Sequence, residues 1–340
     1  MLKQAATFTE SFLQGSSYSG DGELVQSLSA FDLVMLCSSW DARSVSICVE
    51  SGLTAPVCIL LMFNARDTFG LRDEHDRQLK EFAKRHFERV IEVFGDSRNV
   101  GDVWGKIVAI VQRERCVKGR ALSALVDLSA CPKYFSLGFV SFGISTRCCG
   151  HISILYAEGE YASAGTFDEI AFTEGAWDTI PLPGLSGLFS ARLGRKYVVS
   201  LGFEGEKTYR AIARADPDRL CAILPDPSVS VEYVQRTFEA NRFLLQEFGL
   251  QEQSLGRAHA ADSIEVWRTL TQWDLLNRDD DNVYFLPCGT KPHGLGFVLY
   301  SLSRNGPAVL YNLPEKHTVH RTIPNGRFWR FDISDLSSFI

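Results

Sequence analysis

The chain has 340 residues, of which 45% are hydrophobic and 22% are charged. This composition is typical of a folded globular protein of one or two domains and excludes an intrinsically disordered chain. The 35 Lys and Arg residues are outnumbered by 41 Asp and Glu residues, which gives a net charge of -6. We therefore expect no extended nucleic-acid surface, although a local basic pocket stays open.

Strand-like and helix-like segments alternate along the first half of the chain. Apolar runs predict strands at residues 32–37, 57–63, 89–94, 121–127 and 151–156. Apolar residues that return every three or four positions predict helices at 73–86 and 103–111, and the apolar segment 135–144 predicts a third. Strands that alternate with helices favour a doubly wound parallel sheet of the Rossmann type.

The second half of the chain shows a similar series. Strands are predicted at residues 196–201, 220–224, 282–286 and 308–311, and helices at 231–248, 263–276 and 296–301. The closest internal match aligns residues 133–140 with 291–298 at five of eight positions, each time between a strand and a helix. We interpret this match as the trace of an internal duplication.

The predicted fold class is therefore α/β, with two tandem Rossmann-like doubly wound lobes related by pseudo-two-fold symmetry. The lobes are expected at residues 1–190 and 191–340. Each should carry an appended β-hairpin, at 157–190 and 312–340, because both segments contain a Thr-Ile-Pro stretch.

Targeting signals and metal motifs are not apparent. The N-terminus lacks the pattern of a signal peptide, and the longest apolar run, residues 57–63, is far shorter than a membrane span. The nine cysteines include no CxxC pair, which favours buried, reduced thiols. We expect a cytoplasmic protein without a membrane segment, a structural metal or a cofactor.

The loop after the first strand of each lobe is a candidate ligand site, since ligands of doubly wound sheets bind at the carboxyl ends of the strands. In the first lobe, Ser38 and Ser39 can bond a ligand, and Arg43 could contact a phosphate group. In the second lobe, Lys207 and Thr208 could hold an anion. Both loops can equally be ordinary helix caps with solvated charges.

The loop after the fourth strand of each lobe is a second candidate. In the first lobe, Ser129 and Lys133 stand at the start of a helix, where an anion or a sugar hydroxyl is favoured. The matching loop of the second lobe forms the most suggestive stretch in the chain, with the ligand-binding candidates Gly289, Thr290, Lys291 and His293. The alternative is a structural turn between strand and helix. His293 is also a weak candidate for a catalytic group.

Several well-defined catalytic motifs are missing from the sequence. It contains no GxSxG nucleophile elbow, no GxGxxG fingerprint and no GxxxxGK[ST] phosphate loop. The acidic cluster at residues 278–281 precedes a strand and is best interpreted as a solvated loop.

The duplicated unit with its Gly289-Thr290-Lys291 turn resembles the CRISPR-associated Rossmann-fold sensor domains. The resemblance implies two paired copies that bind a nucleotide or cyclic oligonucleotide across their seam. Ser38, Arg43, Lys207 and Thr208 would then supply the loops after the first strands. The chain departs from that family because no effector domain remains once both lobes are counted. This leaves either a stand-alone sensor or ring-cleaving enzyme, or a subunit whose effector is a separately encoded chain.

Three functions follow from these observations. The first is a nucleotide-sensing or adaptor protein, expected in prokaryotic defence, that binds an anionic nucleotide at the strand carboxyl ends. The second is an enzyme on a small nucleotide or sugar phosphate, with His293 or Asp127 as acid or base. The third is a scaffold subunit of a larger complex. The sequence leaves all three open.

Overall fold

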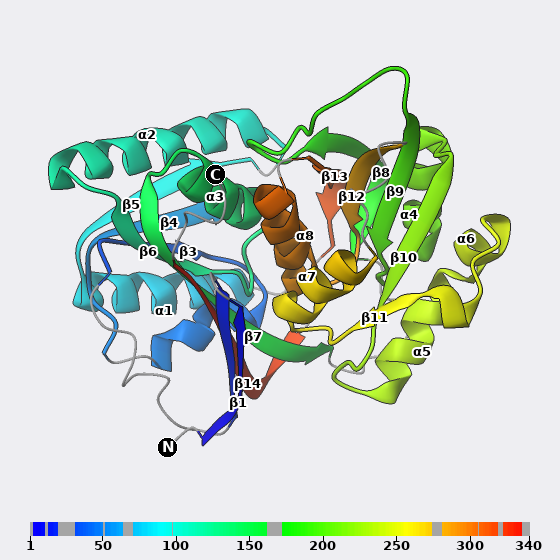
Figure 1. The fold of residues 1–340 in the computed structure, drawn as a ribbon. Coiled ribbons are helices and arrows are strands. Elements are labelled where there is room, and N and C mark those ends of the chain that lie inside the picture. The colour runs from blue at the N-terminus through cyan, green and yellow to red at the C-terminus, as the bar shows by residue number, and fades with distance from the viewer. Residues whose placement is uncertain are drawn as a thin grey trace. The chain divides into compact units, whose positions relative to one another are not determined.

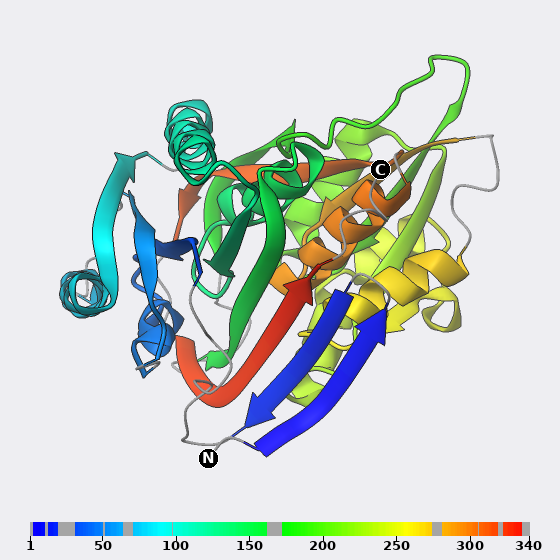
Figure 2. The same cartoon turned by 60° about the vertical axis from the view of Figure 1, so that its left-hand side comes forward.

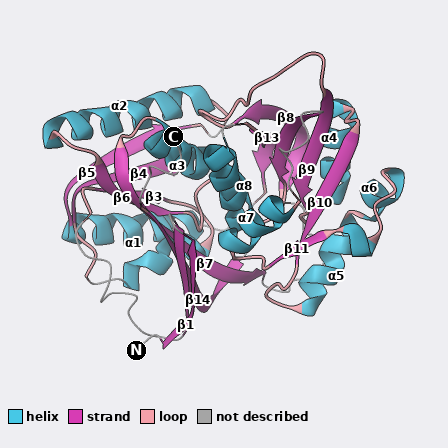
Figure 3. Cartoon of the chain, in the orientation of Figure 1, coloured by secondary structure: helices cyan, strands magenta, loops and turns pink. Residues whose placement is uncertain are grey.

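The computed structural model describes residues 3–10, 13–19, 31–49, 52–63, 71–96, 98–161, 172–273, 281–304, 306–318 and 322–334. The chain folds into two compact units, which we treat separately (Figure 1). The first unit lies mainly within residues 1–136, 142–170 and 318–338, and the second within 137–141 and 171–317. The described strands form one sheet in each unit (Figure 3).

The elements of the first half follow the predicted alternation. They are β1 (Lys3–Glu10), β2 (Leu13–Ser19), β3 (Leu33–Cys37), the 3-10 helix η2 (Ala42–Val49), β4 (Ala55–Phe63), α1 (Leu71–His86), β5 (Phe87–Gly95), α2 (Val100–Lys118), β6 (Leu122–Asp127), α3 (Lys133–Ser145), β7 (Cys149–Tyr161) and β8 (Thr173–Pro181). The ends of α2 show how the sequence sets a helix. Asn99 caps its first turn by accepting from the Asp102 N–H, and Gly119 ends it in the left-handed conformation that favours glycine.

The sheet of the first unit has the strand order β1-β2-β14-β7-β6-β3-β4-β5. The five strands from β7 to β5 are parallel, and their order is that of a doubly wound sheet. Helix α1 covers one face and α2 the other (Figure 1). Strand β3 is buried along its whole length, as expected for a parallel strand covered on both faces.

The elements of the second half follow in the same way. They are β9 (Gly194–Ser200), α4 (Gly205–Ala215), β10 (Arg219–Pro225), α5 (Val231–Ala240), α6 (Arg242–Glu247), the 3-10 turn η4 (Glu252–Ser254), β11 (Gly256–Ala258), α7 (Ser263–Gln272), β12 (Asp281–Pro287), α8 (Lys291–Arg304), β13 (Ala308–His317) and β14 (Thr322–Ile333). Their sheet has the order β11-β10-β9-β12-β13-β8. Its five strands from β11 to β13 are parallel and repeat the doubly wound order of the first unit.

The last strand of each half differs from the prediction. Strand β8 follows the first half in the chain but pairs with β13, and β14 follows the second half but pairs with β7 and β2 (Figure 2). The appended hairpins are therefore not confirmed, since β7 and β8 lie in different sheets. Strand β8 belongs to the second unit and β14 to the first, whereas the lobes were expected at residues 1–190 and 191–340. The duplication stays a prediction, although both units share one strand order.

Candidate functional site

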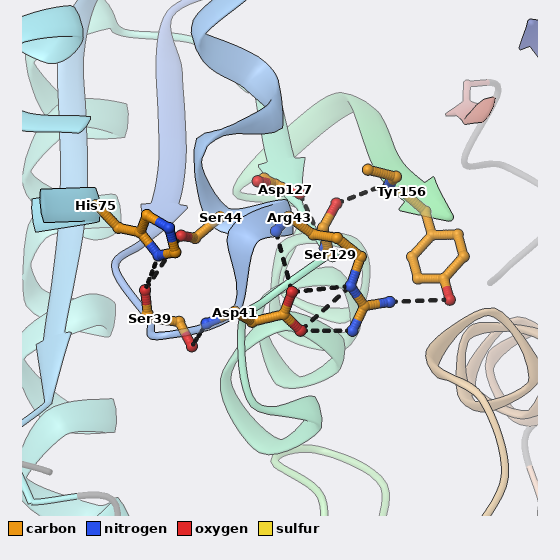
Figure 4. Close-up of polar contacts among 9 residues, drawn as sticks. Ser39, Asp41, Arg43, Ser44, His75, Asp127, Ser129 and Tyr156 are labelled. Carbon is orange, nitrogen blue, oxygen red and sulfur yellow. Dashed lines mark hydrogen bonds and ion pairs between the residues drawn. The ribbon is translucent and has the colours of Figure 1, made fainter. Parts of the chain in front are cut away.

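The strand order of the first sheet changes direction between β3 and β6, and we call this position the reversal point of the sheet. The two strands are adjacent and parallel, and the loops that leave them, residues 38–41 and 128–132, start at the same edge of the sheet. Crevices at such reversal points are where doubly wound proteins bind their ligands. The sequence-predicted residues Ser38, Ser39, Arg43, Ser129 and Lys133 all belong to this edge. Figure 4 shows Ser39, Arg43 and Ser129 among them.

Arg43 is held by Asp41 inside this edge and does not point into solvent. Its Nε and Nη2 lie 3.1 and 2.6 Å from the two Asp41 carboxylate oxygens, and both side chains are 9% exposed. Nη1 donates to the hydroxyl of Tyr156 at 3.4 Å (Figure 4). Burial acts to lower the pKa of Arg43, but the Asp41 carboxylate outweighs it and holds this pKa well above its usual value. Arg43 therefore fixes the loop to β7.

Ser129 ties the second loop to the same strand. Its backbone N–H donates to the Asp127 carboxylate at 2.8 Å, and its hydroxyl oxygen accepts the N–H of Ala157 in β7 at 2.8 Å. Both Asp127 and Ser129 are buried. Two loops that the sequence places far apart are thus braced against one strand, which gives the site a rigid floor.

Helix α1 contributes two residues that the sequence analysis missed. His75 Nδ1 lies 2.9 Å from the backbone oxygen of Ser39, and Ser38 donates its hydroxyl to Asp76. Burial raises the pKa of the Asp76 carboxyl, against the lowering effect of Arg72. The helical pattern predicted α1 but gave no signal for these contacts, because they depend on how the helix packs against the loop.

The start of α3 supplies the positive character of the site. The helix has Pro132 as its N-cap, without a side-chain cap, and Lys133 is its first residue. The N–H groups of Phe135 and Ser136 donate to the Pro132 oxygen. A helix start of this kind favours an anion, through its backbone N–H groups and the helix dipole. Lys133 is half-buried there.

Comparisons with known proteins add little to this geometry. No family model matches the sequence. No curated protein matches it significantly. Among solved structures, a functionally unknown protein, PA1789 from Pseudomonas aeruginosa PAO1, is 11% identical with a TM-score of 0.23, over 84% of this chain and 93% of that chain. A candidate universal stress protein from Pseudomonas aeruginosa UCBPP-PA14 is 12% identical with a TM-score of 0.25, over 83% and 94%. Similarity at these scores does not bear on function.

The reversal point of the second unit, between β9 and β12, is closed by its own backbone. A Cβ atom on Gly289 would lie 2.3 Å from Ser200 Oγ and 2.5 Å from the Leu201 oxygen. One on Gly202 would lie 2.4 Å from the Cys288 oxygen. Both glycines therefore serve the close approach of the two loops, which is a structural reason for the small Gly-Thr turn.

His293 joins three segments of the second unit. It is fully buried, its Nε2 donates to the backbone oxygen of His259 at 3.1 Å, and its Nδ1 lies 3.0 Å from Ser200 Oγ. Since Nε2 must carry the proton to bond a carbonyl, Nδ1 of the neutral ring accepts from the serine hydroxyl. Thr290 likewise donates its hydroxyl to the Ala260 oxygen at 2.5 Å. These contacts give His293 a structural role, because its ring links the segments that contain Ser200 and His259.

The charged candidates of the second unit are arranged differently from those of the first. Lys207 lies 3.2 Å from Glu204 and donates to the backbone oxygen of Thr173 at the start of β8. Thr208 is buried and donates its hydroxyl to the Glu204 oxygen at 3.0 Å. Lys291 is the first residue of α8 and is half-buried, as Lys133 is in α3.

Within the described ranges, no three His, Cys, Asp or Glu side chains are grouped to hold a metal ion. None of the nine cysteines forms a disulfide, and burial raises the pKa of Cys48 and of Cys149 to about 12, which disfavours the reactive thiolate at neutral pH. No described helix is long and apolar enough to cross a bilayer.

Proposed function

We propose that the protein binds an anionic nucleotide ligand at the carboxyl edge of the first sheet, between the loops that follow β3 and β6. One observation carries the proposal. Helix α3 starts at the β3/β6 reversal point with Lys133 as its first residue, and its N-cap residue, Pro132, makes no side-chain cap. The backbone N–H groups and the lysine together suit a phosphate group.

The remaining polar groups of this edge have separate roles in the proposal. Asp41, Arg43 and Ser129 are bonded to one another or to β7, so they hold the loops in place. Ser39 is half-buried, and its oxygen accepts the N–H of Asp41 at 3.2 Å. Its O–H can therefore donate to a ligand oxygen. A prepared site of this kind needs little reordering when the ligand binds.

Binding is favoured over turnover by the state of the two acid–base candidates. His293 is buried with both ring nitrogens in hydrogen bonds, and Asp127 is buried and accepts the Ser129 N–H. Neither side chain is placed to exchange a proton with a ligand in this arrangement. A cyclic oligonucleotide, a role in defence and a separately encoded effector stay predictions of the sequence.

A binding screen on the full chain tests the proposal. Isothermal titration calorimetry should be run with mononucleotides, cyclic dinucleotides, cyclic oligonucleotides and inorganic phosphate. We expect at least one nucleotide to bind with a stoichiometry of one per chain, and its affinity should fall as salt is added because phosphate contacts are screened. Folded protein that binds none of these ligands, or binds them equally well at high salt, would contradict the proposal.

A further inference from the structure

Three polar side chains from distant parts of the chain meet near the amino ends of β6 and β7. Ser123 of β6 and His151 of β7 are direct partners across these two parallel strands. Asp332 of β14 is paired with Ser153, two residues after His151 in β7. Residues two apart in a strand point to the same face of a sheet, and so do cross-strand partners. Ser123, His151 and Asp332 therefore share one face of the first sheet.

The imidazole of His151 connects the other two side chains. Its Nδ1 lies 3.2 Å from the hydroxyl oxygen of Ser123, and its Nε2 lies 3.4 Å from Oδ1 of Asp332. A neutral ring with its proton on Nε2 donates to the carboxylate, which leaves Nδ1 to accept the serine proton. A hydroxyl, a base and a carboxylate that orients the base, in this order, are the parts of an activated serine nucleophile.

The carboxylate is ionised, and the imidazole is held in position. Arg330 Nε lies 2.8 Å from Oδ2 of Asp332, and Ser153 donates its hydroxyl to Oδ1. Burial acts to raise the pKa of Asp332, but the hydrogen bond from His151 and the charge of Arg330 outweigh burial and lower this pKa. The ring of Phe31 stacks on the imidazole, with centroids 6.2 Å apart and planes 7° apart. Asp332 can therefore stabilise the imidazolium that forms when His151 takes a proton.

The serine and the histidine are accessible to a small substrate. The His151 side chain is 34% exposed, and Ser123 is half-buried. The backbone N–H of Ser123 donates to Asp32 at 2.9 Å. Asp32 is also paired with Lys118 at 3.1 Å and with Arg120 at 2.8 Å. These three charges leave one net positive charge beside the serine, which favours the negative charge that develops on a carbonyl oxygen under attack.

The second unit contains a similar serine–histidine contact that lacks these features. Ser200 Oγ lies 3.0 Å from Nδ1 of His293, but both residues are fully buried. Where His151 has a carboxylate, Nε2 of His293 has the neutral backbone oxygen of His259. A substrate cannot reach this hydroxyl, and a carbonyl supports an imidazolium less than a carboxylate does. The pair at Ser200 is therefore a matched internal control for the pair at Ser123.

We propose that Ser123 is the nucleophile and His151 the general base of a hydrolase site for small carboxylic esters, with Asp332 as the residue that positions the base. Esters suit the site because their alcohol leaves more easily than the amine of an amide. The proposal is independent of the nucleotide site, which follows the carboxyl end of β6.

The reaction proceeds through an acyl group on the serine. Ser123 Oγ adds to the ester carbonyl carbon, and its proton moves to Nδ1 of His151. The imidazolium gives this proton to the alcohol oxygen as the C–O bond breaks, which leaves the acyl group on Ser123. Water, deprotonated by His151, then attacks the acyl carbon, and the carboxylic acid leaves as Ser123 regains its proton.

Labelling of the full wild-type chain with a fluorophosphonate tests the nucleophile without any variant. The probe forms a Ser–O–P bond and releases fluoride. Peptide mass mapping should find the label on Ser123 and not on Ser200, and the labelling rate should rise with pH as His151 loses its proton. A folded chain in which Ser123 stays unlabelled at excess probe would overturn the proposal.

Hydrolysis of p-nitrophenyl acetate measures turnover. Ser123→Ala should abolish the hydrolysis that depends on the protein, and His151→Gln should lower kcat/KM by about 10²–10⁴-fold. The control Ser200→Ala should keep the wild-type rate, and circular dichroism checks that each variant is folded. A rate in Ser123→Ala equal to that of the wild type would contradict the proposal, as would an equal loss in Ser200→Ala.

The positioning role of Asp332 has its own readout. In Asp332→Asn the imidazolium loses its anionic partner, so the midpoint of the pH profile of kcat/KM should move to lower pH while KM stays near wild type. Asp332→Glu should recover part of the rate. A rate that falls in Asp332→Asn with an unchanged pH profile would overturn this role.

Discussion

Removing the Asp41 carboxylate should destabilise the first unit, because the Arg43 guanidinium then lies buried without its bidentate partner. Both side chains are 9% exposed, and the shortest contact between them is 2.6 Å. Breaking a buried ion pair from one side costs about 3–5 kcal/mol. Tyr156 still accepts from Nη1, so we expect Asp41→Ala to lose about 3 kcal/mol, at the lower end of this range.

Hydrogen exchange read by mass spectrometry measures this loss separately in each unit. Peptides from β3 and β7 should exchange faster in Asp41→Ala, while peptides from β9 and β12 in the second unit should not change. The double variant Asp41→Ala/Arg43→Met should be more stable than Asp41→Ala alone, because no buried charge remains. A loss below about 1 kcal/mol, the range of exposed pairs, would refute the reasoning, as would a double variant that is less stable than the single one.

Three further variants probe other parts of the structure. Gly289→Ala should cost about 1–3 kcal/mol, since its Cβ would lie 2.5 Å from the Leu201 oxygen, and a urea midpoint equal to wild type would contradict the close loop contact. Burial acts to raise the pKa of Asp32, but a backbone N–H and Arg120 outweigh burial and lower this pKa. The Asp32 carboxylate therefore stabilises the fold above the ordinary Asp pKa of about 3.9, and this stabilisation is lost as pH falls through the folded-state pKa. Asp32→Asn should therefore lower the melting temperature at pH 7, by an amount that shrinks towards pH 3; a loss that is independent of pH would argue against the charge. His293→Phe should cost about 1–3 kcal/mol in urea unfolding, because two buried groups lose their partner, and an unchanged midpoint would show that its bonds do not form.

The parallel strands were predictable because their apolar runs match their burial. Residues 57–63 appear as a strand in the sequence, and β4 is buried along nearly its whole length. The partners of β8 and β14 were not predictable, because a local pattern shows that a strand exists but does not show which strand it joins. The sequence patterns did not predict four elements, namely strands β1 and β2, the three-residue strand β11 and helix α4. The helix predicted at 231–248 is divided at Asn241, whose amide donates to the Gly202 oxygen at 2.7 Å.

The rule for doubly wound sheets predicted the position of the candidate site, but it did not predict the contacts within the site. The sequence placed Ser38, Arg43 and Ser129 after strand carboxyl ends, and in the structure they follow β3 and β6. It could not distinguish an arginine that awaits a phosphate from one that binds Asp41 two residues away. The contacts of His75 and Asp76 were also hidden, because they arise only when α1 packs against the loop.

The central claim is that a nucleotide binds at the start of α3, and the aligned lysines of the two units test it most directly. Isothermal titration calorimetry should compare Lys133→Gln with Lys291→Gln, the matched change at the start of α8. Loss of one charge-assisted hydrogen bond weakens binding by about 5–150-fold. We predict this loss for Lys133→Gln and an affinity near wild type for Lys291→Gln. Full affinity in Lys133→Gln, or an equal loss in both variants, would contradict a site confined to the first unit.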